Sequence, residues 1–337
     1  EQVTVALLAM CLKSMGYNAK SYLGHQVPII TDSAFSKARI DRICDKKVRK
    51  DLDNGAIIIA AGFQGVDRDG NISTLGRGGS DTSAVALAAA LKADVCEIFT
   101  DVDGVYTTDP NICSDARKIE RISYDEMLEL ASLGAKVLQI RSVEFAKKYN
   151  VDVHVRSSFN DNPGTLVTKE DKEMESILVS GITYAKDETK IAVMRVPDKP
   201  GIAAKLLSPL SAANISVDMI VQNASEDGFT DFTFTVCKAD FKKALMITRE
   251  AAGEINARDV MTDECITKIS IVGLGMRSHA GVATKMFETL AAEGINIQMI
   301  STSEIKISVV IDAKYTELAV RVLHDAFGLA GKDVKPE

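Results

Sequence analysis

Apolar residues in the first half of the chain alternate between helical spacing and short continuous runs. Helical spacing is found over Val3–Met15 and in an Ala- and Leu-rich segment at Thr82–Leu91. The runs Ala56–Ala61 and Val95–Thr100 are rich in β-forming residues and have the length of buried strands. Strands and helices that follow one another in this way predict a layered α/β domain.

A second group of elements precedes a change in character. A Ser-Tyr-Asp-Glu sequence provides an N-cap with a glutamate three residues later, so a helix is predicted over Ser123–Leu133. Another helix over Val137–Tyr149 and a strand over Val151–Val155 follow. The next stretch, Arg156–Glu175, is polar and contains Pro163-Gly164, which predicts a boundary or linker.

The second half of the chain contains an internal repeat with a constant offset of 80 residues and no gap. The matched pairs include Gly201 with Gly281, Lys205 with Lys285, Leu210 with Leu290, and Met219 with Met299. Each copy reads as a strand, a helix that begins after glycine, a second strand, an alternating strand and a closing helix. These five elements follow the βαββαβ order, whose last strand they leave out, and they predict two ferredoxin-like modules. Whether a first strand over Ile177–Thr183 pairs inside the other copy stays open.

Composition and charge narrow the range of partners. Forty basic against forty-seven acidic residues give a net charge of −7, so no overall positive field attracts nucleic acid. No apolar run approaches the ~20 residues that a membrane helix needs, and the first residues do not resemble a secretory signal. The six cysteines occur singly without a CxxC pair. We therefore expect a cytoplasmic protein without structural zinc, membrane or nucleic-acid partner.

A glycine-rich turn at residues 75–81, LGRGGSD, is the sharpest chemical signal. Three glycines within four positions let backbone N–H groups approach an anion, and Ser80 or Asp81 can cap the helix that follows. Arg77 adds a planar fork for a carboxylate or phosphate. The turn therefore predicts an anion site, whereas the simpler alternative is a flexible surface turn capped by Asp81.

A second signal, TDVDGVYTTDP at residues 100–110, follows the strand that ends at Thr100. Ligands of open α/β sheets bind beyond the carboxyl ends of strands, and these acids, hydroxyls and Tyr106 can hold a nucleoside and Mg²⁺. The alternative is that Asp103-Gly104 simply closes a hairpin. Lys136 in Gly-Ala-Lys offers a cation to a further phosphate, but a solvated lysine is the common alternative.

Together, GFQGV, LGRGGSDTSAVALAAALKADVCEIFTDVDGVYTTDP and EMLELASLGAKVLQIRSVEFAKKYNV resemble the aspartate kinases of the amino-acid kinase family. The tandem repeat resembles their two regulatory ACT modules. The resemblance implies transfer of the γ-phosphoryl group of MgATP to the side-chain carboxylate of L-aspartate, giving 4-phospho-L-aspartate for lysine, threonine and methionine synthesis. It also implies an amino-acid-kinase-like α/β domain over residues 1–170 and ACT modules over 171–262 and 263–337.

The resemblance assigns expected roles to single residues. Arg77 would hold the α-carboxylate of aspartate, Asp81 would organise the same site, and Glu1 would meet the amino group; Arg77 and Asp81 are the expected catalytic residues. The nucleotide-contacting positions are matched by Gly78, Gly79, Ser80, Thr100, Asp101, Tyr106 and Lys136.

Two features depart from the family pattern. The amino-terminal strand and the Lys-x-Gly-Gly loop are not found in this sequence, which begins at Glu1. We therefore expect a kinase domain that is incomplete at its amino terminus, and no turnover by this sequence alone. Asn111 stands where an arginine commonly follows the Asp-Pro pair, so it supplies no charge to ATP phosphates.

The two repeats differ where an amino-acid effector is expected to bind. An effector needs an acceptor for its ammonium group and donors for its carboxylate, and helix starts at Gly201 and Gly281 supply N–H donors. Asp198 and Glu304 are the expected acceptors, although they can equally be solvated turn residues. The effector positions of the family are matched by Asp198, Gly201, Gln222, Asn223, Asn296, Ser303 and Glu304.

The expected effectors are lysine, threonine or both, and the resemblance implies a homodimer or higher oligomer formed through the ACT modules. Two alternatives remain at this point. A catalytically silent amino-acid sensor would explain the missing loop, but it has no need of Arg77 and Asp81. A kinase for glutamate or acetylglutamate shares the chemistry, but the paired modules argue against it.

Overall fold

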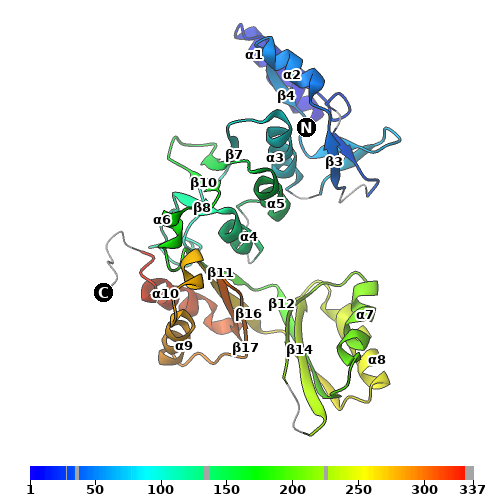
Figure 1. The fold of residues 1–337 in the computed structure, drawn as a ribbon, viewed down its shortest axis with the longest axis vertical. Coiled ribbons are helices and arrows are strands. Elements are labelled where there is room, and N and C mark those ends of the chain that lie inside the picture. Colours follow the sequence, from blue (N-terminus) through cyan, green and yellow to red (C-terminus); the bar gives the residue numbers. More distant parts are fainter. Residues whose placement is uncertain (28, 35–37, 77, 133–136, 224–226, 331–337) are drawn as a thin grey trace. The chain divides into compact units, whose positions relative to one another are not determined.

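The chain divides by its internal contacts into two compact units, which are shown in Figure 1. The computed structural model describes residues 1–337 except 28, 35–37, 77, 133–136, 224–226 and 331–337, and it leaves the side chains of 173 and 175 undescribed. Unit 1 comprises Glu1–Thr107 and Arg117–Ser180, and unit 2 comprises Thr108–Ala116 and Gly181–Glu337. The predicted boundaries at 170/171 and 262/263 stay a prediction, because these contacts do not separate the two modules of the repeat.

Unit 1 contains short strands and helices in alternation. Its elements are α1 (Gln2–Ser14), β1 (Ala19–Tyr22), β2 (Ile29–Thr31), β3 (Ile40–Ile43), α2 (Lys46–Asp53), β4 (Ile57–Ala60), β5 (Gln64–Val66), β6 (Ile72–Thr74), α3 (Gly79–Leu91), β7 (Cys96–Thr100), β8 (Arg121–Ser123), α4 (Tyr124–Ser132), α5 (Ile140–Tyr149), β9 (Val153–Ser157), β10 (Thr165–Thr168) and α6 (Lys172–Glu175). Their sheets run in the orders β1-β4, β3-β2-β5-β6 and β7-β9-β10-β8. The predicted layered α/β class is confirmed, with most element bounds within a few residues of those expected.

The predicted linker at 156–175 is partly wrong. Thr165–Thr168 forms β10, which pairs antiparallel with β9 and parallel with β8, and Thr165 and Val167 are fully buried. Pro163-Gly164 therefore lies in the connection from β9 to β10. A Cβ on Gly164 would lie 1.8 Å from the carbonyl oxygen of Val155, so this crossing requires glycine. The polar residues on both sides of β10 made this four-residue strand look like part of a linker. Its pairing with β8 and β9 stabilises it.

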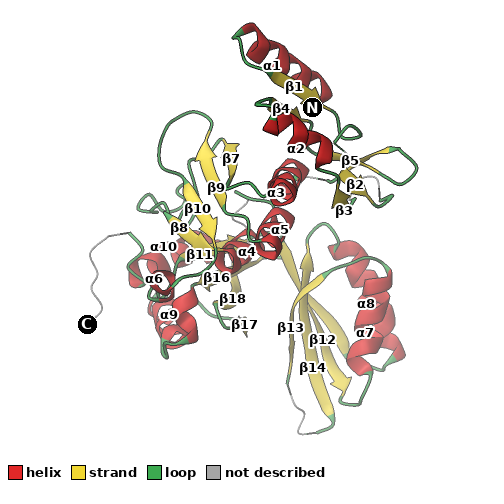
Figure 2. Cartoon of the chain, turned by 45° about the horizontal axis from the view of Figure 1, so that its top comes forward, coloured by secondary structure: helices red, strands yellow, loops and turns green. Residues whose placement is uncertain are grey.

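Unit 2 holds the two modules of the repeat. Its elements are β11 (Gly181–Ala185), β12 (Glu188–Pro197), α7 (Ile202–Ala212), β13 (Val217–Gln222), β14 (Phe229–Cys237), α8 (Phe241–Glu254), β15 (Asp259–Asp263), β16 (Ile266–Val272), the 3₁₀ helix η1 (Leu274–Arg277), α9 (Val282–Ala292), β17 (Met299–Thr302), β18 (Lys306–Asp312), the 3₁₀ helix η2 (Ala313–Tyr315) and α10 (Thr316–Ala326). Figure 2 shows α7 and α8 lying along one face of the first sheet. Leu206, Leu210, Phe232 and Phe234 fill the interface between that sheet and its helices.

The two sheets have the same order, but one strand comes from elsewhere in the chain. The first sheet is β13-β14-β12-β15, and the second is β17-β18-β16-β11. β11 precedes the first module in sequence, yet it pairs antiparallel with β16 from Gly181↔Val272 to Ala185↔Lys268. It occupies the place that β15 takes in the first sheet. The question left open by the sequence is thus resolved, because the strand before the first copy pairs inside the second.

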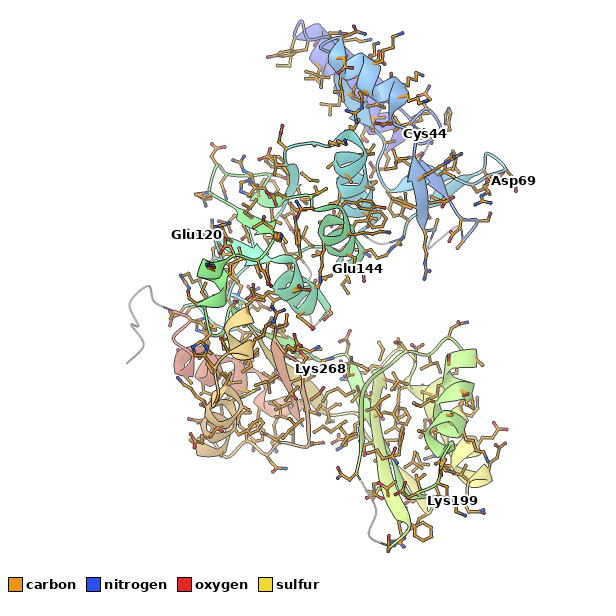
Figure 3. The ribbon with its side chains drawn as sticks, in the orientation of Figure 1. Cys44, Asp69, Glu120, Glu144, Lys199 and Lys268 are labelled. Atoms are coloured by element: carbon orange, nitrogen blue, oxygen red, sulfur yellow. The ribbon has the colours of Figure 1, made fainter. Side chains whose placement is uncertain are left out.

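Residues matched by the repeat meet where the modules join. Met219 and Met299 share one hydrophobic cluster with Ile266 and Val310. Beside it the ammonium group of Lys268, labelled in Figure 3, donates to the carboxylates of Glu188 and Asp218 in the first module. Burial by itself would lower the pKa of Lys268, but the two carboxylates outweigh it and raise that pKa. The lysine therefore stays charged although it is only 4% exposed.

Among the helices of the described residues, none combines the length and hydrophobicity that a membrane span requires.

Candidate active site

The glycine-rich turn leads directly into α3. Gly76 and Gly78 have φ angles of +87° and +66°, a region that favours glycine. A Cβ on Gly78 would lie 2.5 Å from the Gln139 side chain, and one on Gly79 would lie 2.7 Å from Leu75. The backbone is therefore packed too closely for side chains at these positions. Gly78 and Gly79 thus pack against neighbouring side chains, and the role of the turn as an anion site stays a prediction.

The sequence analysis predicted that Ser80 or Asp81 caps this helix, but neither residue is its N-cap. The N-cap is Gly78, without a side-chain cap, and α3 begins at Gly79. The exposed Ser80 and the half-buried Asp81 consequently lie inside the first turn, where a carboxylate faces the positive end of the helix dipole. Because the left-handed Gly78 is the N-cap, the helix begins before Ser80 and Asp81. Side-chain capping signals in the sequence do not reveal this earlier start.

Asp81 lies where the N-termini of two helices converge. Its Oδ2 accepts the Gln139 backbone N–H at 3.4 Å, and its Oδ1 accepts the Ser80 hydroxyl at 3.4 Å. Gln139 is the N-cap of α5, where its side chain accepts from Ser142 N–H, and it also accepts from the Thr82 hydroxyl at 3.3 Å. Burial raises the pKa of the Asp81 carboxyl against the effect of these two donors. Sequence reasoning missed Gln139, because glutamine is an uncommon N-cap.

The same carboxylate lies close to β7. Burial raises the pKa of the Cys96 thiol to about 11, and the charge of Asp81 adds to this shift. Strand β7 runs from Cys96 to Thr100. At its other end, Thr100 donates to Asp101 at 3.1 Å, and Asp101 is exposed.

The turn after β7 is held by Asp103. This carboxylate accepts from Tyr106 Oη at 2.7 Å, from Asn162 Nδ2 at 3.1 Å and from Lys118 Nζ at 3.3 Å. The hydrogen bond to Asp103 raises the pKa of Tyr106 to about 12. The donors, Tyr106 first among them, hold the pKa of Asp103 below its ordinary value. The hairpin alternative is wrong, because β7 pairs with β9 and the next strand, β8, lies across the sheet.

One hydroxyl in this region lacks a partner. Thr108 is 4% exposed, and within the described residues its Oγ1 makes no hydrogen bond. A buried polar group left unpaired costs about 1–3 kcal/mol, so such a group commonly marks a place where a ligand or water binds. Asn111 is exposed and donates its side-chain amide to Asp109 at 3.0 Å.

The other predicted site residues are only partly placed. Arg77 and Lys136 lie outside the described residues. Glu1 is exposed at the start of α1, where its carbonyl accepts from Thr4 Oγ1, and the next residue, Gln2, donates to Gln64 on β5 at 3.1 Å. Its expected role at the aspartate amino group stays a prediction.

The expected effector residues lie at exposed positions of both modules. Gly201 and its counterpart Gly281 are left-handed N-caps of α7 and α9, with φ angles of +89° and +92°. The remaining expected residues are all exposed side chains: Asp198, Gln222, Asn223, Asn296, Ser303 and Glu304. Glu304 already lies 3.7 Å from the Arg277 guanidinium, whereas the Asp198 carboxylate has no ion-pair partner among the described residues.

Known families match both units. The amino acid kinase family matches residues 1–157, and two ACT domain families match residues 190–253 and 269–327. An amino acid kinase region followed by two ACT domains is thus the class that the chain represents.

Individual relatives narrow this class. The aspartate kinase of Pseudomonas fluorescens (strain SBW25) is 62% identical over 330 residues, which cover 98% of this chain and 80% of that protein. The aspartokinase of Corynebacterium glutamicum is 47% identical over 338 residues, or 99% of this chain and 80% of that protein. The chain therefore belongs to the aspartate kinase family and is a phosphotransferase. The predicted family, fold and activity are confirmed, and the sensor and glutamate-kinase alternatives are set aside.

Solved structures agree with this placement. E. coli aspartokinase III in complex with aspartate and ADP has a TM-score of 0.77 and 28% identity, covering 96% of this chain and 73% of that chain. The same enzyme in complex with lysine and aspartate has a TM-score of 0.75 with the same identity and coverage. Clostridium acetobutylicum aspartate kinase has a TM-score of 0.81 and 26% identity, with the same coverage.

Proposed function

We propose that this kinase holds L-aspartate at the α3 N-terminus and MgATP along the turn after β7. The observation that carries the proposal is the convergence of the α3 and α5 N-termini on Asp81, with close-packed glycines before α3. Two helix N-termini provide N–H donors and positive dipole ends for an anionic substrate. Arg77, between these glycines, supplies the fork for the α-carboxylate.

Phosphoryl transfer between two anions depends on positioning and charge neutralisation more than on a covalent nucleophile. The residues of the site suit that demand. Asp81 is a carboxylate whose burial disfavours its charged form, so a nearby cation or ammonium group stabilises it. Its role is to orient the aspartate amino group and the surrounding N–H donors. Glu1 is the second acceptor for that amino group.

The nucleotide fits the turn after β7 on two grounds. The orphaned Thr108 hydroxyl is a buried polar group that a ligand can satisfy, and Asp101 is an exposed carboxylate next to the end of the strand. Mg²⁺ is commonly bound through one or two carboxylates and substrate phosphates, so Asp101 suffices as the protein ligand. Tyr106 is held by Asp103 and therefore presents its ring rather than a free hydroxyl. The magnesium ion would neutralise charge on the phosphates that are transferred.

Lysine, threonine or both act as feedback effectors at the ACT modules in this proposal. The E. coli aspartokinase III complex with lysine supports it for that enzyme, and the exposed Asp198 and Ser303 supply polar groups here. Association through the modules is part of the same proposal. Ile220 on β13 and Ile300 on β17 are 49% and 44% exposed at matched positions of two edge strands, which favours pairing with another copy. A cytoplasmic location stays a prediction.

The substrate site is tested with Arg77→Lys in a chain that carries the upstream segment with the Lys-x-Gly-Gly loop, because no turnover is expected of this sequence alone. A lysine keeps the charge but cannot form the two parallel hydrogen bonds, so kcat/KM for aspartate should fall by about 2–4 kcal/mol, which is roughly 30- to 1000-fold. Arg68→Lys is the matched control, because that guanidinium is 84% exposed in a surface ion pair with Asp41. Steady-state kinetics that leave kcat/KM for aspartate unchanged in Arg77→Lys would refute the proposed site.

A further inference from the structure

The chain passes between the two units three times, after Thr107, after Ala116 and after Ser180. Residues 108–116, which continue the turn that starts after β7, belong to unit 2 by their contacts. The base of this loop closes in unit 1, where Thr107 N–H donates to Arg117 O at 2.8 Å and Arg117 N–H donates to Thr107 Oγ1 at 2.9 Å. The loop therefore has its base in unit 1 and its tip in unit 2.

Asp109 organises the tip of the loop. Its Oδ1 accepts the backbone and side-chain N–H groups of Asn111 at 2.9 and 3.0 Å. Its carbonyl accepts the N–H groups of Ile112 and Cys113, both at 3.0 Å, and Cys113 is buried. The tip is therefore a hydrogen-bonded turn centred on Asp109.

Tyr184 of β11 holds this turn through the second carboxylate oxygen. Its hydroxyl donates to Asp109 Oδ2 at 2.9 Å. Burial, with the Asp109 bond second, raises the pKa of Tyr184 to about 12, so the phenol stays neutral and donates. Burial opposes ionisation of Asp109, yet the donors from Asn111 and Tyr184 hold its pKa below the ordinary value. The contact is thus a charge-assisted hydrogen bond, a class stronger than a bond between neutral groups.

β11 is also tied at its beginning. The Ser180 hydroxyl, just before the strand, donates to the buried carboxylate of Glu126 in unit 1. Glu126 further accepts the N–H and hydroxyl of Ser123. Tyr184 itself lies opposite the fully buried Ile269 of β16, in the second module. Within unit 2, β11 is therefore bonded to the loop after the nucleotide turn and to the second ACT sheet, and it directly follows Ser180, the last residue of unit 1.

We propose that Tyr184 is a positioning residue for the nucleotide: by holding Asp109 it fixes the loop that continues from Tyr106 and Thr108, and so links nucleotide affinity to the second ACT sheet. The proposal rests on the placement of ATP at this turn. Tyr184 ties Asp109 to β11, and the buried Thr108 directly precedes Asp109 in the same unit. Coupling between two sites typically amounts to about 5–150-fold in affinity.

The test is Tyr184→Phe, which retains the ring and removes only the hydroxyl. ADP and L-aspartate binding are measured by calorimetry on the whole chain. The dissociation constant for ADP should rise about 5-fold, while that for aspartate and the thermal midpoint stay close to the parent values. Tyr124→Phe is the matched control, because it loses a hydroxyl bonded to Val151 O at 2.9 Å at a position remote in sequence from the loop.

A double-mutant cycle with Asp109→Ala separates positioning from a merely structural effect. If Tyr184 acts through Asp109, the double variant binds ADP as weakly as Asp109→Ala alone. Asp109→Asn, which retains an acceptor oxygen, should recover part of the affinity. Lysine or threonine should also change ADP affinity less in Tyr184→Phe than in the parent.

The results distinguish this proposal from the proposed function. A parent protein that binds ADP and a Tyr184→Phe variant that binds it equally well would overturn the positioning role and leave the nucleotide site standing. Equal losses of ADP and aspartate affinity, with a lowered thermal midpoint, would also overturn it by showing a general structural defect. A parent that binds no ADP would refute the nucleotide site itself, and with it this inference.

Discussion

The two ACT modules have one topology but are completed in different ways. The first is continuous in sequence, and its edge strand β15 follows α8 and has no buried residue. The second takes its edge strand, β11, from before the first module, and Gly181, Ile182 and Thr183 of that strand are buried. Closing this long connection costs entropy that only burial can offset. An internal repeat in sequence therefore need not give two independent modules. Here the segments of the second module lie before and after the first module in the sequence.

The two copies also differ in the charged residues that they place at the junction. Glu188 and Lys268 stand at matched positions of the repeat, as do Asp218 and Gln298. The side chain of Lys268 is 5% exposed and bonds both acids of the first copy. The side chain of Lys190 is 21% exposed; it donates to Gln298, and its ammonium group lies 3.8 Å from the carboxylate of Asp263. One matched position therefore carries opposite charges in the two copies, and the junction holds one buried ionic cluster around Lys268 and one more exposed pair at Lys190.

The largest difference is expected from removing the two lysines. Lys268→Met should lower the free energy of unfolding by about 4 kcal/mol, because two carboxylates at the junction then lack their cation. Lys190→Met should lower it by less than about 1 kcal/mol, since its partners remain partly solvated. Urea unfolding monitored by circular dichroism measures both. Equal losses would show that burial does not distinguish the two pairs.

The edge strands provide the second comparison. Ile182→Ala in β11 removes a side chain that is 1% exposed and should cost about 3 kcal/mol. Met261→Ala in β15 changes a side chain that is 58% exposed and should change the stability by less than about 0.5 kcal/mol. Thermal unfolding of the two variants decides the matter. If Ile182→Ala were as mild as Met261→Ala, β11 would not complete the second module in solution.

Inhibition by the effectors should depend more on Asp198 than on Glu304. Asp198→Ala should raise the half-inhibitory concentration of lysine or threonine about tenfold, near 1.4 kcal/mol, because the ammonium group loses its acceptor. Glu304→Ala should have a smaller effect, since Arg277 already lies beside that carboxylate. Ser303→Tyr should also reduce inhibition, because a ring adds bulk at the expected effector position. Inhibition curves with each amino acid and with both, measured on the chain with its upstream segment restored, test this prediction. Unchanged curves would leave the modules with a role in assembly only.

The smallest effect concerns pH. Hydrogen bonding and charge from Lys268 outweigh burial and hold the pKa of Asp218 below its ordinary value, so its stabilising contribution is present above about pH 4 and is lost as pH falls further. Asp218→Asn should therefore flatten the acid limb of the stability curve by less than about 1 kcal/mol, because the carboxylate is 54% exposed. Asp259→Asn, at an exposed position of β15, is the control. Identical acid limbs for Asp218→Asn and the parent would contradict this linkage.

Local signals in the sequence were sufficient for the elements and the repeat. Helical spacing predicted α1 and α3, and the glycine-led helices after Gly201 and Gly281 were found where expected. The glycine turn before α3 was evident because only glycine accepts its φ angles and close packing. Arg77 belonged to the same signal. Such features depend on neighbours within a few residues, which the order of residues specifies directly.

The tertiary structure alone decided which distant segments meet. Nothing local distinguishes the four residues of β10 from a polar linker, and nothing in β11 states that its partner is β16 rather than β12. Gln139 reaches Asp81 across 58 positions, and Tyr184 reaches Asp109 across 75. These pairings depend on which sheet edges and buried polar groups remain unsatisfied once the layers have formed, a property of the packed chain and not of any segment within it.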